Sequence, residues 1–329
     1  MKKKSLYWQV PLLVFLIVGT FFIAKQNRKE ALAAQQSTAY QHEEGEVFGT
    51  FYSVTYQAGK SLKADIDKAL AQVDQEFSMF NPNSTVAAIN RGEKPQRSAM
   101  FNEVYELAQH VTADTDGAFD ITVAPLVNAW GFGFKNEQMP TPEQVDSLLK
   151  IRSQMDFSAI AKGYGCDAVA HALEAQGVRD YMVEIGGEVV TRGFSPRQQR
   201  WKIGVSKPVD GELPSDSAGL QTIISVEDAA MATSGNYRNF YYKGGRKYAH
   251  TIDPRTGYPV QHELLSATVL APRCAVADAY ATAFMVLGLD SARQVLQRHP
   301  EMQAYLIYTD AEGRLTEWHS PSLLLQNPD

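Results

Sequence analysis

Two stretches organise this chain: His250-Thr-Ile-Asp-Pro-Arg-Thr-Gly257 and Ala277-Asp-Ala-Tyr-Ala-Thr-Ala283. The first stretch places a histidine, an Asp-Pro turn and a Thr-Gly stop within one short segment. The second is rich in alanine and predicts a helix, on which Asp278 and Thr282, four residues apart, share one face. Carboxylate and hydroxyl oxygens are hard ligands that suit Mg²⁺. A histidine-bearing turn near such a face favours metal-assisted transfer of a phosphoryl-type group.

Each of these signals also has an ordinary structural interpretation. An Asp and a Thr four residues apart on a helix are usually a solvated pair, and a single histidine such as His250 is more often packed or solvated than catalytic. The helix around Asp278 is otherwise apolar, however, so its carboxylate would be half-buried, where a charge without a partner is costly. A bound cation would remove that cost, which is why the metal interpretation is preferred.

The composition bounds the possible classes of protein. The chain has 329 residues, of which 44% are hydrophobic, and can form one large domain or two closely packed halves. A net charge of −6 gives no support for nucleic-acid binding, which needs a basic face. The two cysteines, Cys166 and Cys274, form no CxxC pair, which argues against structural zinc. They are compatible with a disulfide or with two buried free thiols.

The N-terminus predicts a membrane anchor. Basic residues 1–4 precede an uncharged apolar run, Tyr7 to Ala24, which would span roughly 27 Å as a helix. Residues 1–26 are therefore assigned to an anchor that leaves the rest of the chain outside the cytoplasm, and the polar residues 27–45 to a linker. The alternative is a cleaved signal peptide, because Ala31-Leu-Ala33 resembles a cleavage site.

Residues 46–329 are expected to form the globular domain. Strand-like and helix-like segments mix there without a strict β-α-β alternation, which indicates the α+β class. Helices are expected over residues 62–77, 101–112, 275–287 and 291–298. Three more are expected: a short helix capped by Ser84, one that begins with Thr141 as its cap, and one that follows Gly163 and runs through Gln176. Strands are expected over 47–56, on both sides of the glycine pair within 181–190, and over 201–205, 220–226, 265–270 and 302–308.

Two further segments have the composition of a ligand site. Asp156-Phe-Ser-Ala-Ile-Ala-Lys-Gly163 combines an acid, small residues and a lysine beside a glycine, which suits close backbone approach to a phosphate; an ordinary strand-to-helix turn is equally compatible. Gly117-Ala-Phe-Asp120 could stack an aromatic ring on a ligand, but is more typical of a helix stop.

Six segments, taken in this order, resemble the ApbE family of FAD:protein FMN transferases. They are GAFDIT (117–122), DFSAIAKGYG (156–165), VEIGGE (183–188), ATSGNYRN (232–239), HTIDPRTG (250–257) and ADAYATAFMVLG (277–288). The resemblance covers about residues 46–310. It implies a fold of mixed, largely antiparallel sheets flanked by helices.

The resemblance also implies a set of site residues. The metal ligands would be Asp278, Thr282 and the backbone oxygen of Ala159, and His250 would be the catalytic base. FAD contacts would come from Phe48, Phe80, Ala118, Phe119, Asp120, Asp156, Lys162 and Ile252. This chain departs from some relatives at Ala281, where they carry a second Asp, and it lacks a cysteine for lipid attachment.

The activity implied by the resemblance is Mg²⁺-dependent cleavage of FAD, with FMN attached through a phosphoester to a Ser or Thr of a target flavoprotein and AMP released. Acceptors in such a family include subunits of Na⁺-pumping NADH:quinone reductase and Rnf-type complexes. The resemblance places the enzyme on the periplasmic side of the bacterial inner membrane, here through the single predicted helix. Two alternatives remain open, namely a Mg²⁺-dependent FAD pyrophosphatase that gives FMN and AMP, and a non-catalytic FAD-binding protein.

Overall fold

The computed structural model describes residues 39–132, 139–151, 154–208, 219–236, 240–243, 246–249 and 251–327. In this part of the chain, eight strands form one large sheet in the order β1-β2-β3-β4-β7-β10-β11-β12, with every neighbouring pair antiparallel. The strands are β1 (Tyr40–Val47), β2 (Thr50–Gln57), β3 (Tyr181–Ile185), β4 (Glu188–Arg192), β7 (Ala230–Gly235), β10 (Leu264–Ala271), β11 (Gln303–Thr309) and β12 (Leu315–His319).

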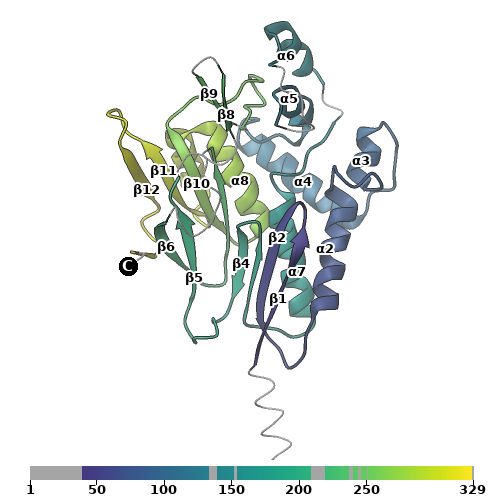
Figure 1. Ribbon diagram of the computed structural model, residues 1–329, viewed down its shortest axis with the longest axis vertical. Coiled ribbons are helices and arrows are strands. Elements are labelled where there is room, and N and C mark those ends of the chain that lie inside the picture. The colour runs from purple at the N-terminus through teal and green to yellow at the C-terminus, as the bar shows by residue number, and fades with distance from the viewer. Residues whose placement is uncertain are drawn as a thin grey trace, which may run out of the picture.

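Helices cover one face of this sheet (Figure 1). α7 packs against β3, β4 and α2, and α8 packs against β7, β10 and α7. The strands alternate accordingly: Tyr52, Val54 and Tyr56 of β2 are buried, and they pack in one core cluster with residues of α2 and α7. The helical elements are α2 (Lys63–Phe77), α3 (Thr85–Asn90), α4 (Ala99–Asp114), η1 (Ile121–Val123), α5 (Ala124–Ala129), α6 (Pro142–Leu148), α7 (Ala161–Ala175), α8 (Cys274–Leu287) and α9 (Leu289–Arg298).

A small second sheet covers part of the opposite face. It has the order β13-β6-β5, built from β13 (Leu325–Gln326), β6 (Leu220–Val226) and β5 (Trp201–Ser206). Its Ile224 and Val226 share a core cluster with Leu270 of β10 and Tyr305 of β11. β10 is therefore enclosed between this sheet and α8, which explains why nearly all of its residues are buried. A separate hairpin pairs β8 (Phe240–Lys243) with β9 (Arg246–Ala249).

The α+β class and the predominance of antiparallel pairing are confirmed. So are two helix starts predicted from capping residues. Ser84 accepts a hydrogen bond from the Ala87 N–H at the start of α3, and Thr141 begins α6 with a reciprocal capping box to Gln144. Beyond the last predicted strand, the chain adds β12 and β13 at the edges of the two sheets.

The predicted start of the domain is wrong by several residues. Residues 40–45, assigned to the linker, belong to β1, and the single strand predicted over 47–56 is a hairpin whose turn is Phe48-Gly49. Both turn residues have positive φ, 52° and 75°, as a two-residue hairpin turn of the favoured type requires. β1 lies at the edge of the sheet with solvent on one side, so its polar sequence resembles that of a linker.

The predicted membrane anchor, residues 1–26, lies outside the described residues and stays a prediction. Among the helices that the structure describes, none is both long enough and apolar enough to cross a membrane.

Candidate active site

The site is built where α7 and α8 cross near their N-terminal ends. Each helix uses a buried carboxylate to hold the first turn of the other. Asp278 of α8 accepts the N–H of Gly163 at 3.0 Å, and Asp167 of α7 accepts the N–H groups of Cys274 and Ala275 at 2.8 and 3.0 Å. N-terminal N–H groups have no partner within their own helix and favour negative charge. This reciprocal arrangement fixes Asp278 against the start of α7.

Lys162 joins Asp278 to a second buried carboxylate. Its Nζ lies 2.8 Å from Glu188 Oε1 and 3.8 Å from Asp278 Oδ1. The two acidic side chains are 5% and 3% exposed, whereas the lysine side chain is 30% exposed. One ammonium group therefore faces two carboxylates in a largely dry setting. The other oxygen of Glu188, Oε2, is buried and has no hydrogen-bond partner among the described residues.

Burial and charge act in opposite directions on these groups. Burial raises the pKa of Glu188 to about 7 and also raises the pKa of Asp278, although Lys162 opposes both shifts. Burial by itself would lower the pKa of Lys162, but the attraction of Asp278 and Glu188 is larger, so its pKa is raised. The lysine is thus a fixed positive charge at neutral pH.

The residues predicted to hold a metal ion provide a suitable set of donors. Asp278 and Thr282 lie one turn apart on α8, and the Thr282 Oγ1 is 3.1 Å from the Ser234 Oγ on β7. If α7 began one turn earlier, the Gly163 N–H would donate to the Ala159 carbonyl. In the structure it donates to Asp278. Carboxylate, hydroxyl and carbonyl oxygens are the ligands of Mg²⁺. With two carboxylates and one ammonium, the cluster carries a formal negative charge that a cation would neutralise.

The two segments predicted to contact FAD lie side by side. The Asp156 N–H donates to the Ile121 carbonyl at 2.6 Å, which joins the 156–163 segment to the 117–122 segment. Asp120 accepts the N–H and hydroxyl of Thr122, and burial raises the pKa of Asp156, whose carboxylate accepts the Ser158 N–H. The structure therefore brings Asp120 and Asp156 into one region, next to the start of α7.

The turn that follows residue 250 is fastened at several points. Trp130, which directly follows α5, donates its Nε1–H to the Gly257 carbonyl at 2.8 Å, and the Thr251 hydroxyl donates to Asn236 at 2.6 Å. A Cβ placed on Gly117 would lie 3.5 Å from the Arg255 side chain, so this turn adjoins the 117–122 segment. His250 itself lies outside the described residues, and its role as a base stays a prediction.

The predicted apolar FAD contacts occupy different environments. Ala118 and Phe119 are almost completely buried, and the Phe119 ring belongs to the main core. Their contacts with FAD stay predictions. The same segment does end a helix, because α4 ends at Asp114 and Gly117, three residues later, has a φ of 76°. Ile252 is buried against Leu126, Trp130 and Val145.

The other two aromatic contacts lie on turns. Phe48, at the tip of the β1–β2 hairpin, packs against Gly165 of α7. Gly165 lies about one helical turn after Lys162. Phe80 is 78% exposed on the turn between α2 and α3. Their contacts with FAD stay predictions.

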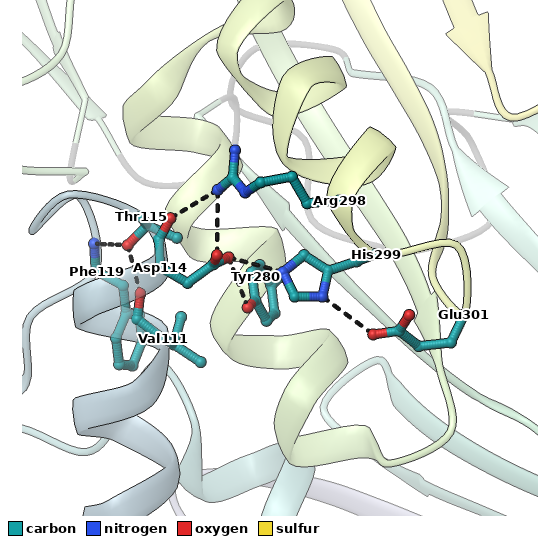
Figure 2. A network of polar contacts seen from close by, with 8 residues as sticks. All are labelled: Val111, Asp114, Thr115, Phe119, Tyr280, Arg298, His299 and Glu301. Atoms are coloured by element: carbon teal, nitrogen blue, oxygen red, sulfur yellow. Dashed lines mark hydrogen bonds and ion pairs between the residues drawn. The ribbon is translucent and has the colours of Figure 1, made fainter.

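A polar network joins the end of α4 to α8 and to the segment after α9 (Figure 2). Asp114 accepts hydrogen bonds from the Tyr280 hydroxyl at 2.9 Å and from Arg298, and its carboxylate lies 3.0 Å from the His299 ring. The next residue, Thr115, donates to the Val111 carbonyl and accepts the Phe119 N–H. The network therefore holds the 117–122 segment against the helix that carries Asp278.

Replacing Asp114 with asparagine is expected to destabilise the fold by about 1–3 kcal/mol, the usual cost of weakening charged hydrogen bonds in a partly buried site. Burial alone would raise the pKa of Asp114, but its bonds from Tyr280, Arg298 and His299 hold it below its usual range. The stabilisation should then be complete above about pH 4 and be lost as the pH falls through the folded-state pKa. Denaturant unfolding of both proteins at pH 7 and at pH 3 measures this.

The matched control is Asp290→Asn, an acid on α9 that is 89% exposed. It should leave the free energy of unfolding unchanged at both pH values. An Asp114→Asn protein as stable as the wild type at pH 7 would contradict the structural role of the network.

Sequence reasoning missed Glu188, Ser234 and the amide of Asn90. Asn90 donates to the Met155 carbonyl at 2.8 Å and accepts its N–H at 2.7 Å, which fixes the segment leading to Asp156. The available signal for Glu188 was an acid directly after a Gly-Gly turn, at the start of a strand of apolar character. Of the two interpretations of the cysteines, the structure has the free thiols: Cys166 and Cys274 are both buried and unbridged.

Comparison with known proteins agrees with this architecture. The model of the ApbE family matches residues 48–306. The FAD:protein FMN transferase of Escherichia coli (strain K12) is 31% identical, over 94% of this chain and 95% of its own length. The enzyme of the same name from Haemophilus influenzae is 34% identical, over 87% and 91%.

A solved structure shares the fold as well. The flavin transferase ApbE from Vibrio cholerae superimposes with a TM-score of 0.76 at 32% identity, and covers 86% of this chain and 98% of its own. Together, the family match over most of the chain and identities above 30% along nearly whole relatives show that this chain belongs to the ApbE family and is a transferase.

Proposed function

We propose that this transferase is a Mg²⁺-dependent FAD:protein FMN transferase. The observation that carries the proposal is the buried cluster of Lys162, Glu188 and Asp278 beside Thr282, because it combines a cation for phosphate with hard oxygen ligands for a metal. The names of the relatives, FAD:protein FMN transferase, support the identity of the donor and of the transferred group.

The reaction proposed is a displacement at phosphorus. The oxygen of a Ser or Thr side chain of the acceptor attacks the FMN-side phosphorus of FAD. A P–O bond forms there, the bond to the AMP phosphate oxygen breaks, and AMP leaves. His250 accepts the hydroxyl proton, for which its ordinary pKa near neutrality suits it. FMN ends attached through a phosphoester.

Other residues of the site bind FAD and the metal ion. Lys162 contacts the anionic pyrophosphate, and the 117–122 and 156–158 segments hold the dinucleotide through backbone groups and the carboxylates of Asp120 and Asp156. Asp278, Thr282 and the Ala159 carbonyl would hold Mg²⁺. When bound, the ion neutralises charge that grows on the departing phosphate.

The acceptors proposed are extracytoplasmic flavoproteins such as subunits of Na⁺-pumping NADH:quinone reductase or Rnf-type complexes. The location proposed is the periplasmic face of the bacterial inner membrane, with residues 1–26 as a single-pass anchor. The support for the anchor is the uncharged run from Tyr7 to Ala24 behind a basic start.

Incubation of the purified full chain with FAD, Mg²⁺ and a peptide carrying a Ser/Thr acceptor tests the proposal. A peptide adduct with the mass of FMN, together with AMP, is the expected result. FMN and AMP without an adduct would instead identify an FAD pyrophosphatase, and bound, unchanged FAD would identify a binding protein.

Replacing His250 with alanine is expected to slow single-turnover transfer by roughly 10²–10⁴-fold while the Kd for FAD stays nearly unchanged, because a base acts mainly in the transition state. The limb of the pH–rate profile that requires a deprotonated group should vanish. Flavin fluorescence gives the Kd, and quenched-flow adduct formation gives the rate.

His42→Ala serves as the control, since His42 is 55% exposed on the edge strand β1. It should change neither quantity. If His250→Ala loses FAD affinity in proportion to its rate, the histidine binds FAD and is not the base.

A further inference from the structure

The geometry around Lys162 raises a conflict between two cations. Asp278 is the only carboxylate in the proposed ligand set, and its Oδ2 already accepts the Gly163 N–H. The remaining oxygen, Oδ1, offers both of its lone pairs to a metal ion, and it is also the one that Lys162 faces. A lysine in direct contact with Oδ1 would compete with the metal.

The observed distances avoid that contact. An ammonium–carboxylate hydrogen bond is usually about 2.7–2.9 Å long. Lys162 reaches this distance with Glu188, at 2.8 Å, but stays at 3.8 Å from Asp278 Oδ1. Glu188 comes from a different element, the start of β4, and its side chain is 5% exposed, so the surrounding packing limits its movement. It draws the lysine toward β4 and away from α8.

We propose that Glu188 is a positioning residue that keeps Lys162 off Asp278 and so leaves Asp278 Oδ1 open to the metal ion. This inference rests on the metal site of the proposed function, and adds to it Glu188, which is outside the proposed sets of metal ligands and FAD contacts. The same contact keeps the lysine charged and within the site, where the pyrophosphate is proposed to bind.

Removal of Glu188 should let the lysine move onto Asp278. Among the described residues, Lys162 has ion pairs with these two carboxylates, so a shift of about 1 Å would bring it into hydrogen-bond distance of Asp278. The ammonium would then occupy the oxygen that the metal needs. Metal affinity should fall even though no metal ligand has been changed.

The test measures Mn²⁺ binding to the full chain without FAD, by isothermal titration calorimetry and by electron paramagnetic resonance of free Mn²⁺. The variants are Glu188→Ala, Glu188→Gln, Lys162→Met and the double variant Glu188→Ala/Lys162→Met. Methionine keeps most of the length of the lysine stem and removes its charge. Circular dichroism and Tm show that each variant is folded.

Glu188→Ala is expected to weaken Mn²⁺ binding about tenfold or more, and Glu188→Gln, which keeps an acceptor for the lysine, by less. The double variant should bind Mn²⁺ at least as tightly as the wild type, because the competing ammonium has gone. This recovery separates positioning from a general structural role, which the second substitution would not repair.

Two results would overturn the inference and leave the proposed function standing. One is an unchanged Mn²⁺ affinity in Glu188→Ala. The other is a loss that persists in the double variant, since Glu188 would then act on the metal directly or through the fold. A wild-type protein that binds no Mn²⁺ would remove the metal site of the proposed function, and this inference with it.

Discussion

Asp278→Asn is expected to lower metal-dependent transfer by at least about 100-fold, the scale seen when one electrostatic partner of a transition state is removed. Asparagine keeps an oxygen that can accept the Gly163 N–H, so the crossing of α7 and α8 should survive. It lacks the negative charge that attracts the ion. The measurement is the transfer rate as a function of Mg²⁺ concentration, with Mn²⁺ affinity determined separately.

Asp167→Asn provides a matched control. Asp167 is also buried and also accepts N–H groups at the start of a helix. It lies on α7, however, and the N–H groups that it accepts belong to α8. We expect it to lower stability and to leave the Mg²⁺ dependence intact. If Asp278→Asn transfers at the wild-type rate with the same metal requirement, the assignment of the metal to Asp278 is wrong.

Local periodicity was enough to predict the face of α8. Asp278 and Thr282 are four residues apart in a helix-forming sequence, and that spacing determines which side they share whatever the rest of the fold does. Helix starts at Ser84 and Thr141 were predictable for the same reason, because a cap is a contact between residues three positions apart.

Contacts between distant elements could not be predicted in this way. The pairing of Lys162 with Glu188, and the reciprocal holding of α7 and α8 by Asp278 and Asp167, depend on how helices and strands pack. Phe119 shows the same limit, since an aromatic side chain in a sequence suits a ligand site or a core equally well, and its burial in the core depends on how distant elements pack. Residues 40–45 were missed because an edge strand has a solvent-facing, polar sequence.

Gly163→Ala is expected to destabilise the protein strongly, although the same change in an exposed helix interior usually stabilises by about 1 kcal/mol. A Cβ on Gly163 would lie 2.4 Å from the Cys274 carbonyl oxygen and 2.8 Å from the Asp278 Cβ. The first of these is a backbone atom at the start of α8, whose N–H groups are held by Asp167. It cannot rotate away, so the two helices must separate.

The separation would act on the site as well as on the fold. It would stretch the 3.0 Å hydrogen bond from the Gly163 N–H to Asp278 and change the distances of Lys162 from the two carboxylates. We therefore expect weaker Mn²⁺ binding, together with a free energy of unfolding lower by about 1–3 kcal/mol or more because of overpacking.

Gly165→Ala is the control, two residues further along α7. Its Cβ would meet the Phe48 ring at 2.8 Å and the end of Ile185 at 3.1 Å, and these side-chain ends can turn aside. Urea unfolding of both variants measures the difference in stability. If Gly163→Ala is as stable as Gly165→Ala, the crossing of α7 and α8 can accommodate a Cβ at position 163. The close approach of the two helices would then not be the reason for the glycine.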